Sequence, residues 1–163
     1  MTEVLAIREK HDGALGDRSS VRLWLRLLSC TMAVEKDVQR RLAVRGATLA
    51  RFDVLAALDR QRAGMNMGAL SRALLVSNGN VTQLVQKLAK DGLVRIAPSP
   101  ADRRASIVRL TGRGRAEFAA LAAAHHDWID ALLAGMDAET RETLYQALGA
   151  LKRSIAKGQS LGS

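Results

Sequence analysis

The sequence predicts a mainly α-helical chain with one small β-hairpin. Along most of the 163 residues, apolar side chains recur at three- and four-residue steps, as they do on the buried faces of helices. Only two short segments, 93–96 and 106–110, have the alternation that is typical of strands. Both prolines of the chain, Pro98 and Pro100, lie between these segments. Because proline excludes a helix interior or a central strand, the segment between them is expected to be an exposed hairpin tip.

Four helices are expected before the hairpin, and the first three are described by their apolar patterns and caps. The first runs from Asp17 or Ser19 to about residue 45, and its apolar stripe is wide enough to contact more than one neighbour. Thr48 is expected to cap a second helix over 49–59, because its hydroxyl can accept a hydrogen bond from an N–H of the first turn. Asn66 starts a third, short helix that ends near residue 74.

The segment from Ser77 to Gly92 predicts a helix with one polar face. Ser77 suits the N-cap, and Gly92 suits the position after the helix, where φ is positive. The break at residues 75–76 provides the turn of a helix-turn-helix. The polar face carries Asn78, Asn80, Thr82, Gln83, Gln86, Lys87 and Lys90. Asn and Gln can bond an adenine edge through two atoms, Thr can contact a thymine methyl, and Gly79 leaves room for a close backbone. Taken alone, such a face is also compatible with plain solvation.

The hairpin tip is basic. Arg103 and Arg104 offer guanidinium groups, which fit phosphates and narrow minor grooves. Asp102 would repel phosphate, so its expected role is to bond the tip backbone or to hold the guanidinium of Arg104. An ordinary charged turn is the alternative. A reading helix beside a basic hairpin is the arrangement of a winged helix-turn-helix.

The charge of the chain is concentrated in this region. The formal net charge is +9, and residues 66–115 contain nine Lys or Arg against two acids, a net of +7. A basic patch spread over a helix and a hairpin is typical of a protein that binds a polyanion. A helix that binds a membrane surface would instead carry large apolar residues opposite its charges. The pattern therefore favours double-stranded DNA and no membrane.

Two further helices follow the hairpin. Thr111 starts a long helix, and Asp137 caps the last one. The first and last helices carry more apolar surface than a monomer of this size can bury, which predicts a homodimer. The expected organisation is an N-terminal arm at 1–18, a helical dimerisation region at 19–60 and 116–157, a DNA-binding winged helix-turn-helix at 61–115 and a disordered tail at 158–163.

These motifs resemble those of the MarR family of bacterial transcription regulators. The matching motifs are Gly92-Leu93-Val94, Asp102 with Arg104, and Leu110-Thr111 followed by Gly114. The resemblance extends over about residues 20–157 and implies a winged helix on a helical dimerisation domain. It implies that Ser77 to Lys87 enter the major groove of an inverted-repeat operator, and that Arg104 with Arg103 enters the minor groove. The sequence departs from the family at Ile96-Ala97, where further basic residues are usual.

The resemblance also implies a transcriptional repressor that a small aromatic ligand releases from its operator. Segments 23–35, 51–60 and 67–82 are similar to a branch that controls aromatic-acid breakdown and responds to hydroxycinnamoyl-CoA thioesters. The expected effector residues are Arg22, Trp24, Arg26, Leu28, Arg51, Phe52, Leu55, His125 and Trp128. The arginines would pair with CoA phosphates, and surface charge is the alternative for each of them.

No catalytic residue, cofactor or metal site is expected. His125 and His126 are adjacent, so on a helix they point about 100° apart and cannot bind one metal together. His126 with Asp130 supplies only two ligands. Cys30 is expected to be a small buried apolar residue; the alternative is a redox-sensing thiol, which needs a nearby base or cation.

A single cysteine, no secretory signal and no apolar run of membrane-spanning length suit a cytoplasmic regulator. Two alternatives from other classes are a CoA-ester-binding protein or enzyme without DNA binding, and a nonspecific nucleic-acid packaging protein. The neutral polar face of the reading helix argues against packaging, which needs charge rather than Asn, Gln and Thr.

Overall fold

The computed structural model of the protein describes residues 18–99 and 105–161. The hairpin tip with Asp102, Arg103 and Arg104 therefore lies outside the described residues, as do most of the N-terminal arm and residues 162–163. The described residues form two compact units, 18–126 and 127–161.

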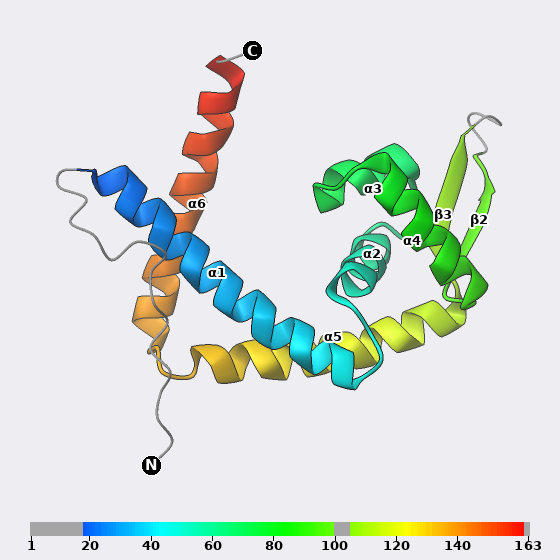
Figure 1. The fold of residues 1–163 in the computed structure, drawn as a ribbon, viewed down its shortest axis with the longest axis horizontal. Helices are drawn as coiled ribbons and strands as arrows, with labels where there is room; N and C mark the ends of the chain where they lie inside the picture. The colour runs from blue at the N-terminus through cyan, green and yellow to red at the C-terminus, as the bar shows by residue number, and fades with distance from the viewer. Residues whose placement is uncertain (1–17, 100–104, 162–163) are drawn as a thin grey trace. The chain divides into compact units, whose positions relative to one another are not determined.

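The first unit contains the helices that the sequence predicted. In chain order they are α1 Ser19–Val44, α2 Leu49–Arg60, α3 Met67–Leu74 and α4 Asn78–Lys90, and α5 Gly112–Leu133 begins in the same unit (Figure 1). Their bounds agree with the expected ones to within a residue or two, and the mainly helical fold class is confirmed. None of the described helices is both long and apolar enough to cross a membrane.

Two predicted N-caps, Thr48 and Ser77, are confirmed, and Asn66, which was expected to start a helix, is the N-cap of α3. The Thr48 hydroxyl accepts a hydrogen bond from the Arg51 N–H at 3.2 Å, and the Asn66 side-chain oxygen accepts from the Ala69 N–H at 2.8 Å. The Ser77 hydroxyl accepts from the Asn80 N–H at 3.4 Å, the longest of the three. Each bond satisfies an N–H that the first helical turn leaves without a backbone partner.

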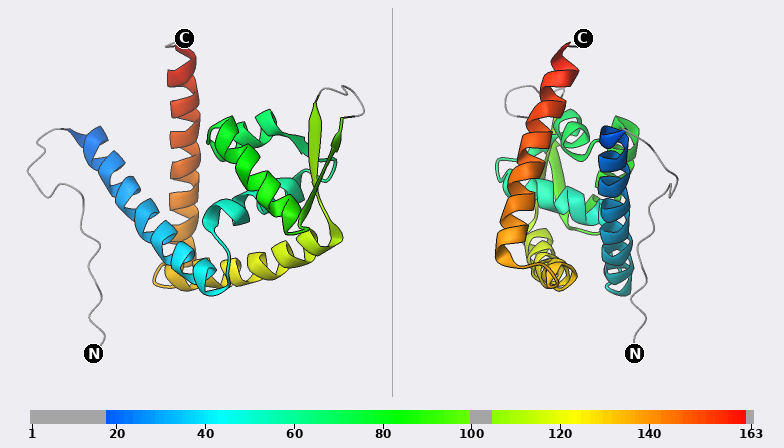
Figure 2. Two further views of the ribbon diagram at one scale, coloured as in Figure 1. Left: turned by 45° about the vertical axis from the view of Figure 1, so that its right-hand side comes forward. Right: turned by 90° about the vertical axis from the view of Figure 1, so that its left-hand side faces the viewer.

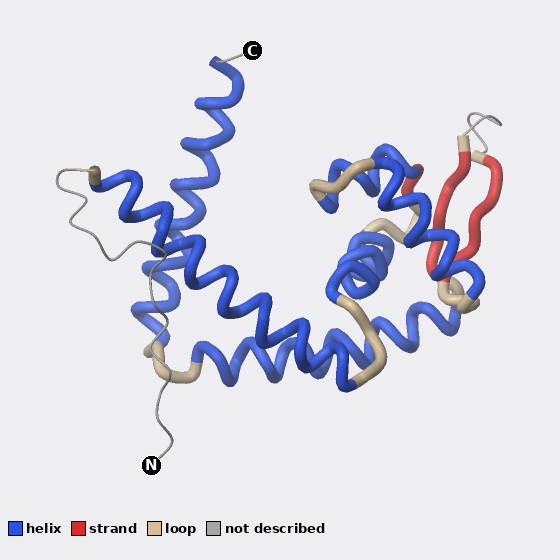
Figure 3. Tube along the Cα trace, in the orientation of Figure 1, coloured by secondary structure: helices blue, strands red, loops and turns tan. Residues whose placement is uncertain are grey.

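The sheet is antiparallel and has the strand order β1-β3-β2 (Figure 3). The long strands are β2 Val94–Pro98 and β3 Ser106–Leu110, and β3 has the predicted bounds. β2 extends two residues beyond its expected end, so Pro98 pairs with Ser106 instead of lying in the tip. Proline is tolerated there because β2 is an edge strand. The two-residue strand β1, Met65–Asn66, was not expected.

The hydrophobic core of the first unit lies between α2, α3, α4 and the hairpin, with the three helices on one side of the strands (Figure 2). Its buried residues are Val54, Leu55, Leu58, Leu70, Val81, Val85, Leu88, Leu93, Val94, Val108 and Leu110. Three of them come from α2. The apolar face of α2 is thus buried against α3, α4 and the hairpin, and the expected domain boundary at residue 61 stays a prediction.

The second unit contains the end of α5 and helix α6, Ala138–Leu161. The Asp137 carboxylate accepts a hydrogen bond from the Thr140 N–H at 2.7 Å, which confirms the predicted cap. The expected disorder from residue 158 is wrong as far as Leu161, because the helix continues through Gly158. Near its end the Ser160 hydroxyl donates to the Lys157 carbonyl at 2.8 Å.

Candidate nucleic-acid interface

Helix α4 is fixed by its apolar face, which leaves its polar face in solvent. Val81 and Val85 are fully buried in the core. On the other side Asn80, Gln83 and Lys87 are exposed and follow one another at three- and four-residue steps. The structure therefore brings these predicted residues together on one face.

The remaining predicted positions of α4 differ in their surroundings. Thr82 is half-buried, at the edge of the exposed face. Gly79 is exposed, and a Cβ added there would have no described atom within 4 Å. Ser77 and the backbone of Asn78 form the start of the helix. The start of α4 is therefore exposed to solvent at Ser77, Gly79 and Asn80.

The turn before α4 is held by backbone contacts with α3. The Val76 N–H donates to the Ser71 carbonyl at 3.2 Å, and the Ser71 hydroxyl donates to the Val76 carbonyl at 2.5 Å. Leu75 has a φ of 55° and is 92% exposed. The left-handed conformation, unusual for leucine, reverses the chain so that α4 follows α3 as the second helix of a helix-turn-helix.

The hairpin presents one described arginine, Arg95, to solvent on β2. Arg109 has another role, because its Nε donates to the Ala63 carbonyl at 2.7 Å and ties β3 to the loop before β1. Ile96 is 40% exposed at the position where the family usually has basic residues.

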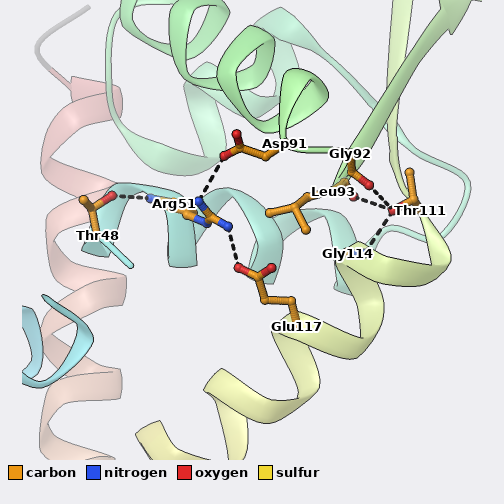
Figure 4. A network of polar contacts seen from close by, with 8 residues as sticks. All are labelled: Thr48, Arg51, Asp91, Gly92, Leu93, Thr111, Gly114 and Glu117. Carbon is orange, nitrogen blue, oxygen red and sulfur yellow. Dashed lines mark hydrogen bonds and ion pairs between the residues drawn. The ribbon is translucent and has the colours of Figure 1, made fainter. Parts of the chain in front are cut away.

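The C-terminal end of α4 is joined to the start of α5 by a set of contacts that we call the Thr111 contact (Figure 4). The Thr111 hydroxyl donates to the Gly92 carbonyl at 2.8 Å and accepts from the Gly114 N–H at 2.9 Å. The Thr111 N–H donates to the Leu93 carbonyl at 2.9 Å. A Cβ at Gly114 would lie 1.9 Å from that carbonyl oxygen, so glycine is required for this close approach. These contacts explain the Leu-Thr-x-x-Gly motif.

A second connection, the Arg51 bridge, joins α2 to both helices. The Arg51 Nη1 donates to the Asp91 carboxylate at 3.1 Å, and its Nη2 donates to the Glu117 carboxylate at 2.6 Å. Both terminal nitrogens of the predicted effector residue are thus bound by carboxylates. Two of its five N–H donors are therefore used within the protein, and the effector role of Arg51 stays a prediction.

The structure brings some of the other predicted effector residues into contact and separates the rest. Phe52 stacks on His125 with ring centroids 4.8 Å apart, and it packs against Phe118 at 5.7 Å. Leu55 is fully buried in the winged-helix core, where a ligand cannot reach it without opening that core. Trp128 belongs to the second unit.

On α1, four predicted effector residues remain accessible. Trp24 is 56% exposed and Leu28 is half-buried. Arg22 and Arg26 line a hollow along the helix together with Ser19 and Leu23.

A cavity that the sequence did not indicate lies between α2 and the end of α3. It has a volume of about 390 Å³, and its lining consists of Asp53, Ala57, Arg60, Gln61, Met65, Ala73, Leu74 and Leu75. Burial raises the pKa of Asp53, and Glu35 raises it further, whereas His125 and Arg60 oppose the shift. The sequence shows that positions 53, 57 and 60 share one face of a helix. It does not show that Ala73, Leu74 and Leu75 lie opposite that face and complete the cavity.

Cys30 is exposed in the single chain, so its interpretation as a buried apolar residue is wrong there. The reason is that its face of α1 is not covered within the described chain.

Within the described ranges, no three His, Cys, Asp or Glu side chains approach closely enough to hold a metal ion.

Comparison with known proteins places this geometry in a family. A family model described as MarR family matches residues 31–105. A MarR family transcriptional regulator from Silicibacter pomeroyi, known as a crystal structure, is 35% identical, with 86% of this chain and 99% of that chain covered and a TM-score of 0.73. The chain belongs to the MarR family. It is a MarR-type transcriptional regulator with a DNA-binding winged helix-turn-helix.

Other similar proteins have a lower sequence identity or match over less of their length. The transcriptional activatory protein BadR of Rhodopseudomonas palustris is 37% identical over 103 residues, which are 62% of this chain and 59% of BadR. The chain therefore spans about three fifths of that relative. The repressor YetL of Bacillus subtilis is 25% identical over 136 residues, 83% of this chain and 81% of YetL. A mutant of MarR from E. coli, crystallised with operator DNA, shares the fold at 23% identity and a TM-score of 0.69, with 81% of this chain and 94% of that chain covered.

Proposed function

We propose that this protein is a homodimeric repressor of the MarR type, which binds an inverted-repeat operator and is released by a small aromatic ligand. The observation that carries the proposal is the exposed face of α4, where Asn80 and Gln83 lie opposite the apolar face that is buried in the core. A repressor of this bacterial type must reach chromosomal DNA, which lies in the cytoplasm of bacteria. The proposed location of the protein is therefore the cytoplasm.

In this proposal, the segment from Ser77 to Lys87 lies in the major groove. Asn80 and Gln83, with Asn78 and Thr82, contact base edges, and Lys87 contacts phosphate. Arg104, with Arg103 beside it and Asp102 holding the tip, contacts the minor groove. The fold that the chain shares with an operator-bound MarR supports this orientation.

The proposed dimer is formed by the first and last helices. In the single chain α1 exposes Val21, Leu23, Trp24 and Met32, and α6 exposes Leu144, Tyr145, Leu148 and Ile155. Apolar side chains in such numbers on two helices are typical of an interface. A two-fold dimer with two reading helices would bind half-sites with centres about 10–10.5 bp apart. Sedimentation equilibrium tests the dimer directly, and a monomer at micromolar concentration would contradict it.

The proposed effector is an aromatic acid or its CoA ester, bound beside Phe52 and His125. Trp24 and Leu28 offer apolar contacts from α1, and Arg22 and Arg26 are candidates for the phosphates of CoA. Trp128 belongs to the second unit, and its effector role stays a prediction.

The DNA-binding proposal is tested by selecting duplexes from a random library with the wild-type protein and measuring their affinity by fluorescence polarisation. Arg104→Ala should weaken binding to the selected duplex by about 1–3 kcal/mol, the usual value of a specific groove contact. Arg141→Ala, at an exposed arginine of α6, is the matched control and should bind as the wild type does. If Arg104→Ala bound the selected duplex as tightly as the wild type, the proposed contact between the hairpin tip and DNA would be wrong.

The effector proposal is tested by titrating a hydroxycinnamoyl-CoA ester, and separately the free acid, into free protein and into protein on its selected duplex. Linkage requires that DNA weaken ligand binding by the same factor by which the ligand weakens DNA binding, typically about 5- to 150-fold. Equal affinities in the two titrations would exclude that compound as the inducer. Tight ester binding by a protein that selects no duplex would favour a CoA-ester-binding protein instead.

A redox-sensing regulator is the second candidate, and the exposure of Cys30 is the observation that favours it. In that case peroxide would lower operator affinity in the wild type and leave Cys30→Ser unchanged. Under the proposed aromatic effector, peroxide would affect the two proteins alike.

A further inference from the structure

We propose that Arg51 is a positioning residue for DNA recognition, which holds α4 at a fixed angle to α5 through the Arg51 bridge. The part of this inference that concerns operator selection rests on the proposed function. Arg51 is not itself a proposed DNA contact. Its guanidinium binds Asp91 at the C-terminal end of α4, whereas the proposed base contacts begin at the N-terminal end of that helix.

The bridge joins three elements that are distant in sequence. Asp91 is the C-cap of α4, 40 positions from Arg51, and Glu117 is on α5, 66 positions away. The three side chains are 21%, 37% and 28% exposed, so solvent screens their interaction only in part. Figure 4 shows the Asp91 and Glu117 carboxylates on either side of the guanidinium.

The bridge and the Thr111 contact act at different points on the same pair of helices. The Thr111 contact fixes the start of α5 against residues 92–93, and by itself it would permit rotation about that point. Glu117 lies six residues farther along α5, about 9 Å at the usual helical rise. Two separated points of attachment fix an angle, whereas one does not.

Arg51 is well placed to hold such an angle. Its own N–H is bound by the Thr48 hydroxyl in the first turn of α2, and its Nε is buried without a hydrogen-bond partner among the described residues. The planar guanidinium can bind two carboxylates at once in set directions, which an ammonium group cannot do with the same geometry. The bridge is therefore specific to arginine.

The bridge also adjoins the aromatic contacts of α5. Phe52 follows Arg51, and Phe118 follows Glu117, and the rings of these two phenylalanines are in contact. His125 stacks on the same Phe52 ring. A displacement of α5 against Phe52 would thus act on Glu117 at the neighbouring position, and through Arg51 on the end of α4.

The test uses the full-length protein and two duplexes, one selected by the wild type from a random library and one of scrambled sequence. Affinities are measured at about 10 °C, close to the usual temperature of maximal stability, after circular dichroism has confirmed that each variant is folded. Arg51→Met should lose roughly 10-fold or more on the selected duplex and less than about 2-fold on the scrambled one. Arg51→Lys should not restore the selected affinity, because lysine retains the charge without the two-sided geometry.

The bridge also predicts non-additive losses at its two carboxylates. Asp91→Asn and Glu117→Gln each remove the negative charge on one side of the guanidinium, so the double variant should lose no more affinity for the selected duplex than Arg51→Met. Glu117→Gln keeps the contact with Asp91 and serves as the second variant if Arg51→Met fails to fold. Arg40→Met, which removes an arginine paired with Asp37 within α1, is the matched control and should match the wild type.

Selected-duplex affinity within about 2-fold of the wild type in folded Arg51→Met, or in Glu117→Gln if the first variant is unfolded, would overturn the inference. So would an equal loss on both duplexes, which is the result for a residue that only stabilises the fold. A wild-type protein that selects no duplex would overturn the proposed function, and this inference with it.

Discussion

The two ends of α4 are built in opposite ways. At the N-terminal end, one side-chain cap of 3.4 Å from Ser77 supports a turn whose glycine and asparagine are exposed. At the C-terminal end, Asp91, Gly92 and Leu93 are bound by Arg51 and Thr111 (Figure 4). The N-terminal end, which we call the open end, is exposed and could contact a partner. The C-terminal end, which we call the closed end, is bound by other residues of the protein.

The difference shows how a reading surface can be both accessible and well placed. Free N–H groups at a helix N-terminus attract phosphate and are of use only when the protein does not occupy them. Rigidity must then come from elsewhere, and in this chain the apolar face and the distant C-terminal end supply it. Substitutions at the two ends should consequently affect different measurements.

The largest expected effect is that of Gly114→Ala at the closed end. The new methyl group would overlap the Leu93 carbonyl, so α5 and the end of α4 would have to separate. The free energy of unfolding, measured in urea, should fall by about 3 kcal/mol or more. Gly112→Ala is the matched control, because a Cβ there meets no described atom within 4 Å. Equal stability of the two variants would contradict the close approach.

Two hydroxyl deletions compare the ends directly. Thr111→Val should lower the free energy of unfolding by about 1–3 kcal/mol, because it leaves the partly buried Gly114 N–H, and the exposed Gly92 carbonyl, without their hydroxyl partner. Ser77→Ala should lower it by only about 0.5 kcal/mol, the low end of the range for caps. A larger loss for Ser77→Ala would mean that the N-terminal end is the more strongly fixed of the two.

At the open end, the expected effects appear in DNA binding and not in stability. Asn80→Ala and Gln83→Ala should each weaken the selected duplex by about 1–3 kcal/mol and relax preference at particular base pairs. Lys87→Ala should weaken all duplexes alike and reduce the salt slope by about 1. If all three behaved as Lys87→Ala does, α4 would be a phosphate-binding helix and not the reader.

The smallest expected effect concerns Asp53, which lies on α2 away from both ends. Burial raises its folded pKa above the usual 3.8, so its ionised form destabilises the fold. The wild type therefore loses stability as the pH rises through that folded pKa, and Asp53→Asn does not. The free energy of unfolding of Asp53→Asn should exceed that of the wild type at pH 7, by less than about 1 kcal/mol because the group is half-solvated. The difference should vanish below pH 3.8. A constant difference across this range would rule out ionisation as the cause.

The sequence predicted the elements and their caps because these depend on neighbouring residues. Thr48, Asn66, Ser77 and Asp137 cap helices in the expected way, and the strand 106–110 has the predicted bounds. Thr111 and Gly114 were recognised only as a motif, because the Leu93 carbonyl that requires glycine lies about 20 positions earlier in the chain.

Residues whose surroundings come from other elements were harder to interpret. Arg51 was expected to meet an effector, because nothing local indicates that its partners are Asp91 and Glu117. Leu55 and Cys30 both follow apolar patterns, yet one is fully buried and the other exposed, since burial depends on which neighbour covers each helix face. The DNA-contact and effector assignments remain predictions.

Gly79 illustrates what an open helix end permits over evolution and in protein engineering. The fold has no need of glycine there, because a side chain would meet no described atom and the backbone is ordinary helix. Glycine within a helix lowers stability by roughly 0.5–1 kcal/mol relative to alanine. Position 79 can therefore acquire a new side chain on the reading face while the helix gains stability. Any selective pressure to retain glycine at this position must originate in the molecule that α4 contacts.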